Sequence, residues 1–246
     1  MIPKIIHYCW FGDKEIPEQL KKYMASWKKY CPDYELKLWN EENFDINSNQ
    51  YVKEAYENKK YAFVTDYVRL FALYNYGGIY MDTDVEILKP LDELLVHKAF
   101  TGFESEGFVP TGILASEKNV PIFKELLDDY QTRHFVNDDG TFDMTTNTKT
   151  ITQILSSKGM KMNNTYQEFC DITIYPSDYF CPIDWKTKKK NITENTYVIH
   201  WFAGSWVQPK SAIQKLKDAI KKQLNKVFGK EKTKRIIKFL KGERDI

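Results

Sequence analysis

The segment Gly77-Gly78-Ile79-Tyr80-Met81-Asp82-Thr83-Asp84 constrains this chain more than any other. A glycine pair introduces a short apolar run, and two carboxylates one residue apart follow it. Carboxylates this close repel each other unless a cation or a proton lies between them. Paired hard oxygen ligands suit Mg²⁺ or Mn²⁺, which keep coordination positions open for phosphate oxygens. The segment therefore predicts a metal–diphosphate site at the carboxyl end of a strand, where open α/β sheets bind ligands.

The acidic pair by itself has a second interpretation. Asp-x-Asp is short and also occurs by chance in solvated turns. Because strand side chains alternate, Asp82 and Asp84 are expected to face the same way only if the strand continues through them. The residues that precede the pair are needed to choose between a metal site and a turn.

Length and composition narrow the class of protein. The 246 residues correspond to one large domain or one domain with an appendage, and a hydrophobic fraction of 42% is enough for a core. A net charge of +2 gives no general reason to expect nucleic-acid binding. The four cysteines show no metal-type spacing and are expected to be reduced thiols. No apolar run approaches the ~20 residues of a membrane-spanning helix, and no signal peptide is expected, so the predicted location is cytoplasmic.

Apolar periodicity predicts strands that alternate with helices. Strands are expected at residues 2–8, 34–39, 79–81, 85–88, 99–103, 112–115, 172–175 and 197–199. Helices are expected at residues 17–30, 52–56, 62–76, 120–130 and 148–155. This alternation favours an α/β sheet with mixed strand directions.

The chain changes character after residue 206. From residue 207 to the end there are thirteen Lys and Arg against four Asp and Glu, whereas everything before is net acidic. From residue 211, apolar residues follow helical spacing with lysines on the other face. Two interpretations stay open: amphipathic helices packed on the domain, or peripheral docking of residues 211–246 on the anionic inner face of the cell membrane.

Asp66 and Arg69 lie three residues apart on the helix expected at 62–76, so they share a face. That helix runs directly into the glycine pair. A carboxylate there can accept hydrogen bonds from ribose hydroxyls, and a guanidinium can hold a diphosphate bidentately. An ordinary intrahelical ion pair is the alternative.

These segments together resemble the signature of glycosyltransferase family 32. The resemblance is carried by Thr65-Asp66-Tyr67-Val68-Arg69-Leu70, then Leu73-Tyr74, then Gly77 to Asp84. It extends to the opening Ile2-Pro3-Lys4-Ile5-Ile6-His7-Tyr8-Cys9-Trp10 and the late His200-Trp201-Phe202-Ala203-Gly204-Ser205-Trp206, and so covers roughly residues 1–206. The family includes yeast-type initiating α-mannosyltransferases and bacterial capsular-polysaccharide transferases, and it is similar to the catalytic domain of clostridial glucosylating toxins.

The resemblance implies an α/β fold of the GT-A type, a Rossmann-like mixed sheet flanked by helices. The implied glycosyltransferase domain covers residues 1–206, and a basic amphipathic helical tail follows over 207–246. For the donor, it implies that Trp10 stacks on or borders the nucleobase and that Asn40 helps to hold the nucleoside. The other implied donor-binding residues are Asp66, Arg69, Tyr80, Asp82, Ser205 and Trp206, the last two on a loop that closes over the diphosphate.

For the metal, the resemblance implies Mn²⁺ or Mg²⁺ with Asp84 as the main ligand and Asp82 shared between metal and donor. His200 stands where related transferases supply a late ligand, although the toxins use a carboxylate there, and a core histidine is the alternative. His7 lies inside an apolar strand and is expected to be structural. The predicted catalytic residues are Asp82, Asp84 and Arg69.

The implied reaction is metal-dependent transfer of a sugar, with retention, from a nucleoside-diphosphate sugar to a hydroxyl of a saccharide acceptor. A UDP-hexose is the favoured donor, a GDP-sugar the second choice, and the acceptor can be lipid-linked. The expected role is bacterial surface-polysaccharide (capsule) synthesis. Front-side displacement is preferred, because the sequence nominates no carboxylate nucleophile. Acceptor contacts are expected at 111–112 and 143–148. A metal-dependent nucleotidyltransferase and a non-catalytic nucleotide- or glycan-binding module are the alternatives.

Overall fold

The computed structural model describes residues 1–104, 107–109, 112–204, 223–225 and 229. The chain divides into two compact units, residues 1–203 and 204–246, and the fold described below is that of the first. Nearly all of the predicted basic tail lies outside the described residues. No helix among the described residues is long and apolar enough to cross a membrane.

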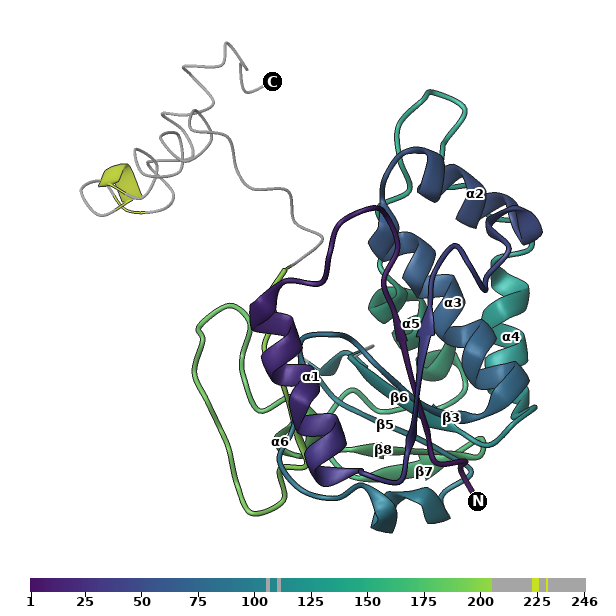
Figure 1. The fold of residues 1–246 in the computed structure, drawn as a ribbon. Coiled ribbons are helices and arrows are strands. Elements are labelled where there is room, and N and C mark those ends of the chain that lie inside the picture. Colours follow the sequence, from purple (N-terminus) through teal and green to yellow (C-terminus); the bar gives the residue numbers. More distant parts are fainter. Residues whose placement is uncertain (105–106, 110–111, 205–222, 226–228, 230–246) are drawn as a thin grey trace. The chain divides into compact units, whose positions relative to one another are not determined.

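A mixed seven-stranded sheet, with strand order β2-β1-β3-β6-β5-β8-β7, forms the centre of this unit (Figure 1). β1, β2 and β3 are parallel, β6 runs antiparallel to β3 and β5, and β8 is parallel to β5 and antiparallel to β7. A separate antiparallel pair joins β4 to β9. The strands are β1 Ile5–Cys9, β2 Glu35–Trp39, β3 Gly78–Met81, β4 Val85–Ile87, β5 Ala99–Gly102, β6 Ile113–Ser116, β7 Gln167–Phe169, β8 Ile172–Tyr175 and β9 Val198–His200.

Helices flank the sheet, and α1 lies apart from the group formed by α2, α3 and α4 (Figure 1). Alternate residues of β3 face two different parts of the core. Ile79 and Met81 belong to a buried cluster that includes Trp27 of α1. Tyr80 belongs to a second cluster, which includes residues of α2, α3 and α4. The helices are α1 Glu18–Tyr30, α2 Gln50–Glu57, α3 Tyr61–Tyr76, α4 Pro121–Asp129, α5 Asn147–Ser157 and α6 Ser177–Phe180, with short 3-10 helices η1 Ile46–Ser48 and η2 Asp92–Val96.

The predicted mixed α/β sheet flanked by helices is confirmed, and two details were wrong. The first strand begins at Ile5, since Pro3 has no amide hydrogen to give to a ladder. β7 and α6 were missed. The turn expected between the predicted strands 79–81 and 85–88 is present: β3 ends at Met81, and Asp82 and Asp84 lie on a tight turn before β4.

His7 connects β1 to the glycine pair that ends α3. Its Nε2–H donates to the carbonyl of Gly77 over 2.7 Å, and its Nδ1 accepts from Nε1–H of Trp39 over 3.1 Å. A Cβ at Gly78, where φ is +108°, would lie 3.0 Å from His7 Nε2 and 2.7 Å from the carbonyl oxygen of Ile5. The glycine pair therefore permits close packing of β1 on β3, and the contacts of His7 are structural.

We expect His7 to make folding pH-dependent. Burial and, less strongly, the charge of Lys37 lower the pKa of His7 to about 4, although the bond to the Gly77 carbonyl acts to raise it. Since the pKa is lower in the folded state, stability is full above the unfolded pKa of about 6.5 and is lost as pH falls towards 4. The loss from His7 between about pH 7 and about pH 5 is about 2 kcal/mol of unfolding free energy. An NMR titration of the ring gives the test, and a His7 pKa near its ordinary value would contradict this assignment.

Candidate active site

The acidic turn follows β3 at the carboxyl end of the strand. The amide of Asp82 donates to the carbonyl of Gly112 over 2.9 Å, and the amide of Val85 donates to the carbonyl of Asp82 over 3.0 Å. These bonds close the turn and direct the chain into β4. Because Val85 pairs with His200 in the β4–β9 ladder, the turn places Asp84 beside a histidine far away in the sequence.

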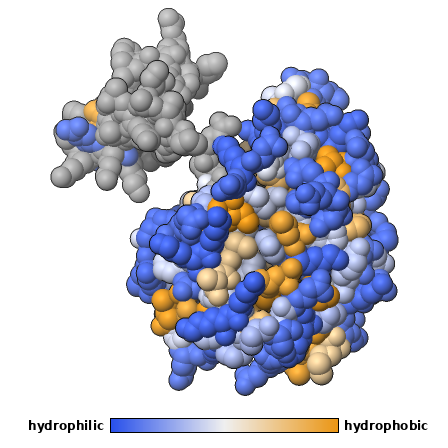
Figure 2. Space-filling model, viewed as in Figure 1, coloured by the Kyte–Doolittle hydropathy of each residue, from blue (hydrophilic) through white to orange (hydrophobic). Residues whose placement is uncertain are grey.

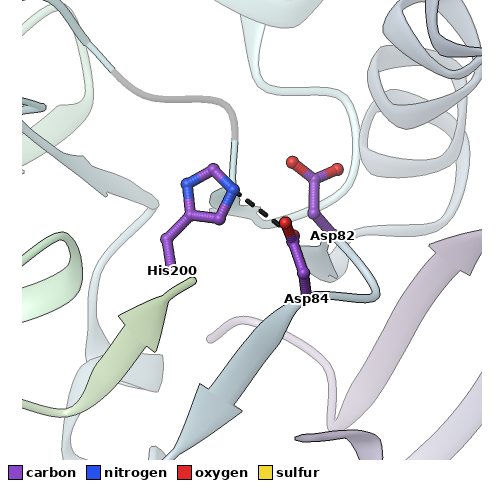
Figure 3. Close-up of side chains that lie close together, drawn as sticks. All are labelled: Asp82, Asp84 and His200. Carbon is purple, nitrogen blue, oxygen red and sulfur yellow. Dashed lines mark ion pairs between the residues drawn. The ribbon is translucent and has the colours of Figure 1, made fainter. Parts of the chain in front are cut away.

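Asp82, Asp84 and His200 form a candidate metal centre (Figure 3). One ligand atom from each of them lies within 4.8 Å of the others. His200 Nε2 is 3.3 Å from Asp84 Oδ1, and Asp84 is buried whereas Asp82 is partly exposed. Two carboxylates and an imidazole with an accessible side are a donor set that fits Mn²⁺ or Mg²⁺ and leaves positions for phosphate oxygens.

The segment after β9 folds back on Asp84. The amide of Ala203 donates to Asp84 Oδ2 over 2.8 Å, and the ring of Phe202 lies against that of His200, with centroids 4.1 Å apart. Phe202 has a left-handed backbone, with φ of +51°, which turns the next amide towards the carboxylate. Burial raises the pKa of Asp84, but His200 and the Ala203 amide outweigh it and keep this pKa below its ordinary value.

His200 is paired with Asp84. Burial lowers its pKa, but the Asp84 carboxylate and the nearby Cys181 thiol raise it well above the ordinary value. Gly112 packs against the same ring, because a Cβ there would lie 2.8 Å from His200 Nδ1. Gly112 therefore contacts two members of the candidate metal centre, Asp82 through its amide and His200 through its ring. The sequence had suggested Gly112 only as a contact for the acceptor.

Arg69 lies at the centre of a second group of polar residues beside the acidic turn. Its guanidinium is 3.2 Å from Asp66 Oδ1 and 3.3 Å from Asp82 Oδ1, and it packs over the ring of Tyr80 at 4.6 Å. Tyr80 Oη also donates to Asp82 Oδ1, over 2.9 Å. The Arg69 side chain is only 5% exposed. The structure thus brings Asp66, Arg69, Tyr80 and Asp82 together, with the guanidinium buried between the two carboxylates.

Asp66 also joins α3 to the start of α5. The Asn147 amide donates to Asp66 Oδ2 over 3.2 Å, and Asn147 Nδ2 donates to the Asp66 carbonyl over 2.6 Å. Burial raises the pKa of Asp66 to about 6, although Arg69 and the Asn147 amide act to lower it. Asn147 therefore belongs to the polar group around Asp66. The sequence had indicated Asn147 only as one residue of the segment 143–148, where acceptor contacts were expected.

The remaining predicted donor-binding residues follow neighbouring strands. Trp10 comes directly after β1, and its Nε1–H donates to the carbonyl of Lys14 over 2.5 Å. Asn40 comes directly after β2, and its Oδ1 accepts from the amide of Glu42 over 3.1 Å. Because β1, β2 and β3 are parallel, Trp10, Asn40 and Asp82 lie at the same edge of the sheet. The predicted donor-binding residues Ser205 and Trp206, and Thr111, lie outside the described residues.

Trp201 anchors the segment that carries His200. Its amide donates to the Asp84 carbonyl over 3.1 Å, and its Nε1–H donates to Glu86 Oε2 over 2.8 Å. Its ring stacks on Tyr23 of α1, with centroids 5.4 Å apart and planes 10° from parallel. The sequence showed Trp201 within a motif but gave no partner for it, since both contacts come from distant segments.

We expect Trp201→Phe to weaken metal binding. The phenyl ring keeps the stack on Tyr23 but loses the hydrogen bond to Glu86, so the His200 segment is held less firmly. The Mn²⁺ concentration for half-maximal activity should rise about tenfold, the usual effect of a lost outer contact. Glu86→Gln keeps an acceptor for the indole and should remain near the wild type. Equal Mn²⁺ dependence of Trp201→Phe and the wild type would contradict this role.

The helix α3 and the acidic turn lie in a region of the chain that matches a known family. Residues 17–101, from α1 to β5, match the family described as the glycosyltransferase sugar-binding region containing the DXD motif. The region from α1 to β5 is therefore similar to the sugar-binding region of DXD-containing glycosyltransferases. The matched residues include Asp66, Arg69, Asp82 and Asp84, and the resemblance to family 32 is thereby confirmed.

Curated relatives of this chain come from fungi and a virus. Inositol phosphoceramide mannosyltransferase 3 of Schizosaccharomyces pombe is 34% identical over 130 residues, which are 51% of this chain and 36% of the relative. Mannosyl phosphorylinositol ceramide synthase SUR1 of Saccharomyces cerevisiae is 33% identical over 52% of this chain and 34% of its own length. This chain thus aligns with about a third of the length of these two relatives. An uncharacterized glycosyltransferase of Acanthamoeba polyphaga mimivirus is 28% identical over 84% of both chains.

Solved glycosyltransferases align with a large part of the chain. The PaToxG glycosyltransferase aligns with 64% of this chain and 69% of its own, with 20% identity and a TM-score of 0.46. A glycosyltransferase involved in glycosylation of the major capsid of PBCV-1 covers 81% of this chain and 95% of its own, with 11% identity and a TM-score of 0.46.

Proposed function

We propose that this chain transfers a hexosyl group from a nucleoside-diphosphate sugar to a hydroxyl of a saccharide or glycolipid acceptor, with Mn²⁺ or Mg²⁺ as cofactor. The observation that carries the proposal is the Asp82–Asp84–His200 cluster at the carboxyl end of β3. A UDP-hexose is the favoured donor. Mannose joins the candidate sugars, because the fungal relatives are named as mannosyltransferases.

Each residue of the site has a separate task in this reaction. Asp84, Asp82 and His200 would hold the divalent ion, which when bound offsets the charge that grows on the departing diphosphate. Arg69 is buried between Asp66 and Asp82, and this favours a positioning role over the predicted direct contact with the diphosphate. Asp66, Trp10 and Asn40 would contact the nucleoside and sugar. Retention by front-side displacement is our preferred route, and a sugar trapped covalently on Asp or Glu would contradict it.

A donor panel tests the proposed reaction. Purified chain with Mn²⁺ is incubated with UDP- and GDP-hexoses, and the released nucleoside diphosphate and pyrophosphate are measured separately. Release of nucleoside diphosphate that stops when EDTA removes the metal supports sugar transfer. Release of pyrophosphate would instead identify a nucleotidyltransferase, and binding without turnover would identify a binding module. The role in bacterial surface-polysaccharide synthesis stays a prediction, which a screen of saccharide acceptors would test.

A further inference from the structure

The loop between α6 and β9 contains a basic hairpin that the proposed reaction does not use. Residues 182–192 include one aspartate and four lysines, Lys186, Lys188, Lys189 and Lys190, all exposed. Trp185 is 45% exposed and Ile192 is 49% exposed. The loop belongs to the green segment at the left edge of Figure 1, and Figure 2 shows this edge as mainly hydrophilic with an apolar patch. Exposed large apolar side chains among cations are typical of contact surfaces.

The hairpin has a defined conformation. Asp184 Oδ1 accepts from the amides of Lys186, over 3.1 Å, and Thr187, over 2.6 Å. The Asp184 amide donates to the carbonyl of Lys189 over 3.0 Å, and Ile183 forms a β-bridge with Lys190. The one acid of residues 182–192 is therefore bonded to its own turn, and the four lysines give the hairpin a positive surface.

The base of the hairpin adjoins the metal-site segment. Lys190 Nζ lies 4.8 Å from the centre of the Trp201 ring, and Lys188 Nζ lies 5.8 Å from the centre of the Phe202 ring. Trp201 and Phe202 directly follow His200. A surface that binds the hairpin would consequently lie next to the site of sugar transfer.

We propose that hairpin 182–192 docks this enzyme on an anionic lipid bilayer, with its lysines near headgroup phosphates and Trp185 and Ile192 in the interfacial region. Lysines neutralise anionic headgroups, and Trp prefers the boundary between headgroups and acyl chains. The inference rests on the proposed function, because it concerns an acceptor held at a membrane surface. It is independent of the predicted docking of residues 211–246.

Flotation of the full chain with vesicles tests the proposal. Vesicles of phosphatidylcholine alone are compared with vesicles that also contain phosphatidylserine. The test variants are Lys186→Gln/Lys189→Gln and Trp185→Ala, which leave Lys188 and Lys190 in place. A matched control, Lys118→Gln/Lys124→Gln, removes two exposed lysines at and before α4. Because each lysine near an anionic surface strengthens binding up to about fivefold, the double hairpin variant should bind anionic vesicles about tenfold or more weakly, and the control should match the wild type.

Donor hydrolysis without vesicles separates this proposal from the proposed function. The hairpin variants should hydrolyse donor at the wild-type rate, since Trp185, Lys186 and Lys189 lie outside the metal site. Equal binding of wild type and double variant to anionic vesicles would overturn the docking proposal, as would binding to neutral vesicles alone or to neither kind. If vesicles bind but no donor is hydrolysed, the proposed function fails while the docking surface stands.

Discussion

Replacing Asp84 with Asn should lower kcat/KM for donor turnover at least about 1000-fold, the largest effect we expect from a conservative change. Asp84 Oδ1 faces His200 and Oδ2 accepts from the Ala203 amide, so the carboxylate organises both the metal site and the segment after β9. An amide of the same shape keeps the volume but loses the charge that attracts a divalent ion. Initial rates with Mn²⁺ and the preferred sugar nucleotide give the measurement.

A carboxylate outside the site provides the control for Asp84. Glu54 accepts from the amides of Phe135 and Val136 and from the His134 ring, and these donors help to lower its pKa to about 2 although burial opposes them. Glu54→Gln also replaces a multiply bonded carboxylate with an amide and should change the rate less than about threefold, since Glu54 on α2 is not part of the Asp82–Asp84–His200 cluster. Similar rate losses in both variants would assign Asp84 a purely structural role.

Replacing Arg69 with Lys should lower kcat/KM about 100-fold or more, because a lysine cannot reach several partners as the planar guanidinium does. Arg69 is bonded to Asp66, Asp82 and the Thr65 carbonyl, the last over 3.2 Å. Its loss leaves two carboxylates close together and misplaces Asp82. We expect KM for the donor to rise together with the fall in kcat, as measured by steady-state kinetics.

Arg133 offers a matched control for Arg69. It bonds to Asp129 over 3.2 Å and Asp143 over 2.8 Å, and it packs over Tyr130 at 4.8 Å, so it resembles Arg69 in having two acids and a tyrosine ring. Arg133→Lys should lower stability by about 1–3 kcal/mol, as Arg69→Lys does, but leave catalysis within a few-fold of the wild type. If Arg69→Lys and Arg133→Lys lose the same stability and also the same activity, Arg69 acts only on the fold.

The sequence predicted the part of the site that lies on continuous elements. Periodicity and the glycine pair located α3 and β3 within one residue of their observed bounds, and so located Asp66, Arg69 and the acidic pair. β7 was missed because its three residues at the sheet edge, none of them buried, carry no apolar alternation. The turn at the acidic pair, between the strands expected at 79–81 and 85–88, is closed by the bond from the Val85 amide to the Asp82 carbonyl.

Contacts between distant segments were beyond sequence reasoning. Pairing of β4 with β9 brings Asp84 to His200, and only the family resemblance suggested that histidine. The packing of Gly112 on His200, the Ala203 amide on Asp84 and the Glu86 anchor of Trp201 depend on tertiary structure. A backbone amide or a glycine has no side-chain signal of a ligand role, and physical patterns along the chain therefore could not assign these groups.

Metal binding in the presence of nucleoside diphosphate tests the central claim most directly. Titration of the purified chain with Mn²⁺, followed by electron paramagnetic resonance, should show one bound ion whose affinity rises when UDP or GDP is added. Asp84→Asn should lose that ion while its circular dichroism spectrum stays that of the wild type. An ion bound equally well by Asp84→Asn, or no bound ion in the wild type with nucleotide, would contradict a metal–diphosphate site at Asp82, Asp84 and His200.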